Sequence, residues 1–156
     1  MSFIQKVIGA GLRWHVRRKA RGMNLARAMV DLRTSFDEVV MPRIEQVADT
    51  PGNREAVNHW LGIERWSLSR VRVALGEPFV EGGYQPFRQP EGTSWEDLKE
   101  EFGRARQETL ELAEVFERRG VDEEFTVRHN DLGPLTVLEW FVYIDDHSRR
   151  EVIRLR

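Results

Sequence analysis

Apolar residues recur along most of this chain at steps of three and four, the spacing that places side chains on one face of an α-helix. The clearest stripe starts at Trp95 and reaches Phe116 through Leu98, Phe102 and Leu112. No stretch indicates a strand ladder. Four stretches carry the helical pattern: residues 24–48, 50–75, 93–119 and 136–156. Helices of this length bury their apolar faces on one another, so the sequence predicts an all-α fold built as a four-helix bundle.

Local signals mark the starts of these helices and the connections between them. Thr93 and Glu96 have the spacing of a capping box, in which each side chain bonds to the backbone at the helix start. A second box begins at Thr136. The connections 77–93 and 120–135 are long, and connections of this length often cover a functional site.

The first 22 residues differ from the rest of the chain. They contain six basic residues and no acidic one, so within a net charge of −2 the remaining residues 23–156 sum to −8. We expect an additional N-terminal amphipathic helix that packs on the single domain formed by residues 23–156, or on a second subunit in a homodimer. Contact with a membrane surface is the weaker alternative, and the acidic body argues against nucleic acid as a partner. The apolar residues of this segment fall on one helical face: Phe3, Ile4, Val7, Ile8, Leu12 and Trp14.

Composition narrows the function classes further. With 156 residues, of which 40% are hydrophobic, the chain fits one globular domain. It contains no cysteine, which excludes a disulfide framework, a Cys-based zinc site and a protein-borne thiol nucleophile. No apolar run approaches the ~20 residues of a membrane span, and the N-terminus lacks the pattern of a signal peptide. We therefore expect a cytoplasmic protein without a transmembrane segment.

Ionisable residues enter the apolar stripes of two helices. The stripe of the last helix ends in His147 and Glu151, one turn apart on the same face, and His59 lies at the edge of the stripe of the second helix. Two imidazoles and a carboxylate from facing helices would hold a divalent metal and leave coordination positions open for catalysis. The alternative is structural, with Glu151 paired to a nearby arginine and His59 a hydrogen-bonded rim residue. We expect the other two histidines, His15 and His129, to be solvated.

Three motifs occur in a specific order and at specific separations. They are His59-Trp60-Leu61-Gly62-Ile63-Glu64-Arg65-Trp66, then Ser94-Trp95, then Gly133-Pro134-Leu135-Thr136-Val137-Leu138-Glu139-Trp140 leading into Ile144-Asp145-Asp146-His147. Over about residues 24–156 this order resembles the DinB-like superfamily of small bacterial four-helix bundles. The basic N-terminal segment lies outside the usual pattern of that family.

The resemblance implies a divalent metal held by three histidines, one on the second helix and two on the last. His59 and His147 match the first two positions, whereas Glu151 stands at the third. Carboxylate is a competent ligand for zinc, nickel, manganese or iron, so the departure alters the charge and the preferred metal. For some members the resemblance also implies S-transferase or related hydrolase chemistry on a small-molecule substrate with a low-molecular-weight thiol. Glu151 fits equally well a metal-free bundle that acts as an interaction protein.

Further residues would shape a metal site of this kind. Asp146, beside His147, would orient a ligand or relay a proton. Residues of the connection 77–93 would close over the site. The candidates for the pocket walls and the cover are Tyr143, Trp66, Trp60, Tyr84 and Arg88.

Overall fold

The computed structural model describes the backbone of residues 3–156 and the side chains from residue 9 onward. The chain is mostly helical, as predicted, and it also contains one antiparallel pair of short strands, which the sequence analysis did not expect. In this pair Val127 lies opposite Leu135, and both side chains are buried. The elements are α1 (Phe3–Ala20), α2 (Leu25–Ser35), α3 (Met41–Gln46), α4 (Pro51–Val71), α5 (Trp95–Arg119), β1 (Thr126–His129), β2 (Gly133–Thr136) and α6 (Val137–Glu151).

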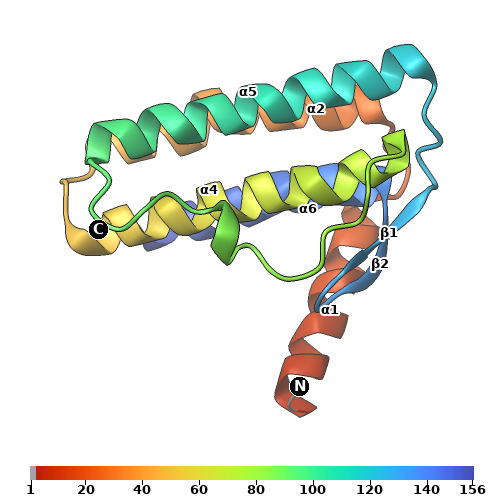
Figure 1. Cartoon of the computed structure of the whole chain (residues 1–156), viewed down its shortest axis with the longest axis horizontal. Coiled ribbons are helices and arrows are strands. Elements are labelled where there is room, and N and C mark those ends of the chain that lie inside the picture. The colour runs from red at the N-terminus through yellow and green to blue at the C-terminus, as the bar shows by residue number, and fades with distance from the viewer. Residues whose placement is uncertain (1–2) are drawn as a thin grey trace.

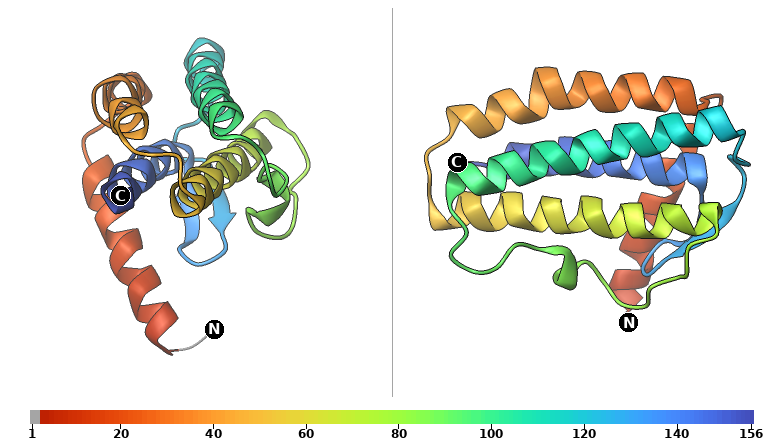
Figure 2. Two further views of the ribbon diagram at one scale, coloured as in Figure 1. Left: turned by 90° about the vertical axis from the view of Figure 1, so that its left-hand side faces the viewer. Right: turned by 45° about the horizontal axis from the view of Figure 1, so that its top comes forward.

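Four helical rods lie side by side (Figure 1). A π-helical turn, Phe36–Val40, joins α2 to α3 in one rod, and α4, α5 and α6 form the others. Helix α4 packs on α5 and α6, and α2 packs on α5 and α6. The connection between α4 and α5 runs along α4, whereas α1 and the strand pair lie together at one end of the rods (Figure 2). Among the helices that the structure describes, none combines the length and the apolar character needed to cross a bilayer.

Capping side chains explain where the long helices begin. The box predicted at Thr136 is present, with both of its reciprocal bonds. At the start of α5, however, the cap is Ser94, whose hydroxyl accepts a hydrogen bond from the Asp97 backbone N–H at 3.1 Å. Thr93 instead donates to the Pro90 carbonyl oxygen at 2.7 Å. The box predicted from Thr93 is therefore wrong by one residue, because the loop carbonyl takes up the threonine hydroxyl.

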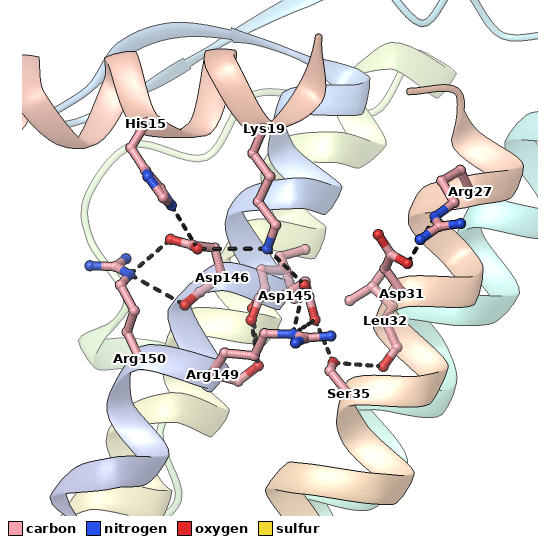
Figure 3. Close-up of polar contacts among 12 residues, drawn as sticks. His15, Lys19, Arg27, Asp31, Leu32, Ser35, Asp145, Asp146, Arg149 and Arg150 are labelled. Atoms are coloured by element: carbon pink, nitrogen blue, oxygen red, sulfur yellow. Dashed lines mark hydrogen bonds and ion pairs between the residues drawn. The ribbon is translucent and has the colours of Figure 1, made fainter. Parts of the chain in front are cut away.

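The second half of α1 docks on α6 through ion pairs (Figure 3). Nε2 of His15 lies 3.0 Å from Oδ1 of Asp146, and Nζ of Lys19 lies 3.1 Å from Oδ2 of Asp145. Val16, which lies between His15 and Lys19 in the sequence, is completely buried. The N-terminal helix therefore packs on the rest of the domain by opposite charges as well as by apolar contact.

The first half of α1 extends beyond the four rods (Figure 2). Leu12 packs at the edge of the core, but Trp14 is 60% exposed and carries the guanidinium of Arg18 over its ring at 5.2 Å. The assignment of Trp14 to a packed apolar face is therefore wrong. The side chains of the other residues assigned to that face lie outside the described part of the chain: Phe3, Ile4, Val7 and Ile8.

The apolar core is divided into two layers by polar side chains. One layer gathers around Phe116 and Phe141 near the strand pair, and the other gathers around Trp60 and Phe102 toward the C-terminus. Between the two layers each rod contributes buried polar residues, namely Ser35, Glu64, Arg106, Thr109 and Ser148. We refer to these five residues as the polar layer.

An ion pair forms the centre of the polar layer. Nε of Arg106 donates to Oε1 of Glu64 at 2.7 Å and Nη2 donates to Oε2 at 3.2 Å, and both side chains are at most 2% exposed. The same guanidinium donates to Oγ of Ser148 and to the carbonyl oxygen of Leu32, each at 3.1 Å. Thr109 donates to the Glu64 carboxylate at 2.8 Å. Because α2, α4, α5 and α6 all take part, this pair connects the four rods.

Removal of one member of this pair should destabilise the protein strongly. We expect Glu64→Leu to lower the free energy of unfolding by about 3–5 kcal/mol, because it leaves the buried charge of Arg106 without a counter-ion. The double variant Glu64→Leu/Arg106→Met should recover most of this loss, since neither charge then remains buried. Urea denaturation measures both effects.

The exposed pair of Glu100 and Arg104 provides the control. Glu100→Ala should change stability by less than about 1 kcal/mol, because solvent screens a surface pair. A loss in Glu64→Leu no larger than that of the control would contradict the central role of the ion pair.

Candidate functional site

Two histidines predicted as metal ligands lie next to each other on adjacent helices. His59 projects from α4 and His147 from α6, and the centroids of their rings are 5.5 Å apart with the ring planes inclined by 54°. Both side chains are partly buried. Helical periodicity explains their meeting, because each histidine continues the inward stripe of its own helix.

The surroundings of both histidines favour the neutral imidazole. Burial lowers the pKa of His147 to about 3, and the neighbouring charges of His59 and Arg150 act in the same direction. Burial also lowers the pKa of His59, although the Glu151 carboxylate opposes this shift. A neutral imidazole has a free lone pair on one ring nitrogen, which is the form that binds a metal ion.

Glu151, the third predicted ligand, lies near His59 but is engaged elsewhere. Its Oε2 atom lies 2.8 Å from Nη1 of Arg154, one turn further along the chain. Within the part of the chain that the structure describes, no three His, Asp or Glu side chains lie close enough together to hold a metal ion. The structure therefore presents a pair of imidazoles with a carboxylate nearby, and not an assembled three-ligand site.

The long connection before α5 covers this pair from one side. Tyr84 stands edge-on against His59, with ring centroids 4.7 Å apart. Arg88 forms an ion pair with Glu55, one turn before His59 on α4. Tyr84 and Arg88 thus lie where the sequence analysis expected a cover.

The aromatic residues proposed as pocket walls have different positions. The Tyr143 ring lies 5.9 Å from His147, and burial raises the pKa of its hydroxyl. Trp60 is 1% exposed and packs on Phe102 in the core, and it lines a small internal space together with His147. Trp66 is buried two turns beyond His59.

The Asp146 carboxylate faces α1 (Figure 3). One carboxylate oxygen lies 3.0 Å from Nε2 of His15, and the other lies 2.8 Å from Nε of Arg150. These partners lower the pKa of Asp146 against the opposing effect of its burial. His15, although its side chain is 50% exposed, is thus a structural partner of α6 and not a freely solvated residue.

His129 was expected to be solvated, and this expectation is wrong. It is 5% exposed, at the end of β1, and its Nδ1 atom accepts hydrogen bonds from the backbone N–H groups of Asp131 and Leu132, both at 3.1 Å. The ring is enclosed by Trp66, Trp140 and Tyr143, with centroids 4.9–5.2 Å away. Burial and the nearby charge of Arg70 lower its pKa to about 4. In the sequence only Val127 of residues 126–129 is apolar, so the alternation of exposed and buried residues in β1 left no signal that could reveal a strand.

A cleft of about 760 Å³ lies at the start of α4, and neither His59 nor His147 belongs to its lining. It is bounded by the first two turns of α4 and by the end of the connection before α5. Its lining includes the ion pair of Glu55 and Arg88 and also Asn58, which directly precedes His59 on α4. A volume of this size suits a small molecule.

The buried His129 should make stability depend on pH. In the unfolded chain a histidine takes up a proton near pH 6.5, whereas folded His129 does so only near pH 4. The unfolded state therefore binds the proton first, and the free energy of unfolding falls as the pH drops from 6.5 toward 4. His129→Asn keeps an acceptor for the two backbone N–H groups but does not titrate. We expect the acid-induced loss to be smaller in this variant by about 3 kcal/mol. Parallel stability curves from urea denaturation at pH 7, 6, 5 and 4 would contradict the assignment.

Comparison with known proteins does not supply a function for this chain. No family model matches the sequence, and neither a curated protein nor a solved structure matches it. A functional proposal therefore depends on the residues themselves. The features that bear on it are the neutral histidine pair, the nearby carboxylate and the cleft at the start of α4.

Proposed function

We propose that the chain binds one divalent metal ion at His59 and His147 and acts as a metal-dependent enzyme on a small molecule. The observation that carries this proposal is the contact between two neutral imidazoles on adjacent helices. Because both histidines already favour the unprotonated form, few protons have to leave the imidazoles when a metal ion binds. The cleft at the start of α4 would supply the space for a substrate.

Glu151 is the third ligand in this proposal, after its release from Arg154. The guanidinium side of this pair is 72% exposed, and exchange of such a pair for another partner costs about 1 kcal/mol or less. Two imidazoles and one carboxylate suit zinc, nickel, manganese or iron. The donor types therefore fit a divalent metal, although the carboxylate must first leave its present partner.

The proposed reaction class is thiol-dependent S-transfer or a related hydrolysis, as in members of the DinB-like four-helix bundles. A bound divalent metal would lower the pKa of a water or thiol ligand and so supply a nucleophile at neutral pH. His59 and His147 would hold the metal, Tyr143 would limit the pocket beside His147, and Tyr84 would exclude water from the side of His59.

A second candidate is a metal-free bundle that acts through protein contacts. The pairing of Glu151 with Arg154 favours it, because this pair leaves only two ligands in place. The extension of α1 beyond the four rods is also consistent with an interaction protein, including a homodimer. Metal binding separates the two candidates directly.

Loss of one histidine should abolish metal binding. We expect untagged wild-type protein, stripped with a chelator and dialysed, to bind one equivalent of zinc, nickel or manganese in isothermal titration calorimetry. His147→Ala should reduce the affinity at least about 100-fold, because a single imidazole with one carboxylate rarely retains a divalent ion. His15→Ala is the matched control, since His15 lies on α1 beside Asp146 and should leave the affinity unchanged. Equal binding by both variants, or no binding by the wild type, would overturn the proposal.

Removal of Arg154 should strengthen metal binding if Glu151 is a ligand. Arg154→Ala frees the carboxylate, and we expect the dissociation constant to fall by roughly three- to tenfold, the range expected for loss of a surface pair. The double variant Arg154→Ala/Glu151→Ala distinguishes this effect from a general reduction of positive charge. A gain in affinity that persists in the double variant would show that Glu151 is not a ligand.

A further inference from the structure

Residues Gly82–Gln89, which we call the strap, are held at their first residue by three donors. The carbonyl oxygen of Gly82 accepts a hydrogen bond from Nη2 of Arg70 at 2.7 Å, from Nδ2 of Asn130 at 2.9 Å and from Nε1 of Trp66 at 3.2 Å. Gly82 itself has a φ angle of 102°, a conformation that favours glycine. Three elements, α4, the strand pair and the strap, therefore meet at one carbonyl group.

Arg70 is an unusual donor for this purpose. Its side chain is completely buried, and no carboxylate lies within ion-pair distance of it in the described part of the chain. Its guanidinium carbon lies 4.0 Å from the ring centroid of Phe79 and 5.1 Å from that of Trp66. The aromatic faces and the Gly82 carbonyl therefore take the place of a counter-ion. Burial of a cation without a counter-ion costs stability, and the hydrogen bond from Arg70 to Gly82 links α4 to the strap.

The other end of the strap is fixed by two reciprocal hydrogen bonds between the Asn58 side-chain amide and the Gln89 backbone. Nδ2 of Asn58 donates to the Gln89 carbonyl oxygen at 3.0 Å, and the Gln89 backbone N–H donates to Oδ1 of Asn58 at 2.8 Å. Asn58 is 8% exposed and directly precedes His59 on α4. The strap is therefore tied to α4 both beside His59 and three turns further along the helix, at Arg70.

A glycine on α4 allows the middle of the strap to lie directly against the helix. A Cβ atom added at Gly62 would lie 2.7 Å from Cγ of Arg88 and 3.2 Å from both Cδ2 and the carbonyl oxygen of Tyr84. A Cβ atom at Gly62 therefore forces the Arg88 side chain to shift and presses on the ring and the backbone of Tyr84. The position of Tyr84 against His59 thus depends on the absence of a side chain at Gly62.

We infer that the strap is a prebuilt cover of the histidine pair and that Arg70, Asn58 and Gly62 are its positioning residues. The closed position is established by folding, before a ligand arrives, because both ends are bonded and the middle is in contact. This inference extends the proposed function and rests on it only where metal binding is concerned. Whether the strap covers His59 can be measured in the metal-free protein.

The test is the rate at which diethyl pyrocarbonate modifies each histidine of the metal-free protein, followed by peptide mass spectrometry. His15, whose side chain is 50% exposed, is the internal reference. We expect Gly62→Ala and Arg70→Met each to raise the rate at His59 by roughly three- to tenfold relative to His15, as expected for loss of a local closed state. Gly103→Ala and Arg104→Met are the matched controls, because Gly103 has open space around its Cβ position and Arg104 is an exposed arginine of α5.

Three outcomes would overturn the inference. They are an unchanged rate at His59 in folded Gly62→Ala protein, an equal increase in the controls, and a parallel increase at the deeply buried His129, which would indicate general loosening. Arg70→Lys, which keeps a donor for Gly82, should restore part of the protection.

If the wild type binds no metal and yet these variants expose His59 selectively, the proposed metal site is wrong and the strap inference stands. If metal binds, both opening variants should weaken it, and the controls should not.

Discussion

The buried pair of Arg106 and Glu64 is the interaction on which the arrangement of the four rods depends. A guanidinium without exposure to water must find a partner for each of its polar edges, and here those partners come from three other helices. Such a pair adds little net stability compared with apolar side chains of the same size, but it tolerates very few alternative arrangements. It therefore fixes the axial position of each rod relative to the others. The contact between His59 and His147 follows, because each lies within five residues of a member of the polar layer on its own helix.

One turn of helix α6 makes polar or aromatic contacts with several other helices. Four consecutive residues, 145–148, together contact four other helices, α1, α2, α4 and α5: Asp145 contacts Ser35 and Lys19, Asp146 contacts His15, His147 contacts His59, and Ser148 contacts Arg106. Successive residues of an α-helix are about 100° apart, so four of them point almost all the way round its axis. Helix α6 is therefore surrounded, and its polar side chains are distributed among its neighbours, not collected on a solvent face.

The sequence predicted a mostly helical chain because the apolar period of each helix extends over several turns. It predicted the capping box from the four residues that begin at Thr136. It also placed His59 and His147 on facing helices, where their rings lie 5.5 Å apart. It did not predict the strand pair, since each strand has four residues and only Val127, His129 and Leu135 are buried there, too few to define a period. From sequence alone, charged residues such as Glu64 and Arg106 are expected at the surface. Their burial is evident only when the helices that pack around them are known. His129 was missed for the same reason, because the aromatic rings around it come from α4 and α6.

The docking of α1 has a consequence for the charge balance of the whole molecule. The first 22 residues carry six positive charges, and the rest of the chain carries an excess of eight negative ones. Lys19 and His15 lie on the two buried carboxylates of α6, so α1 acts as a covalently attached counter-ion for the acidic body. Dissolved salt competes with an ion held in this way, whereas it has little access to the polar layer inside the rods. The ion pairs between α1 and α6 and the polar layer therefore respond differently to ionic strength. Of the two, the attachment of α1 is the one that the salt concentration can change.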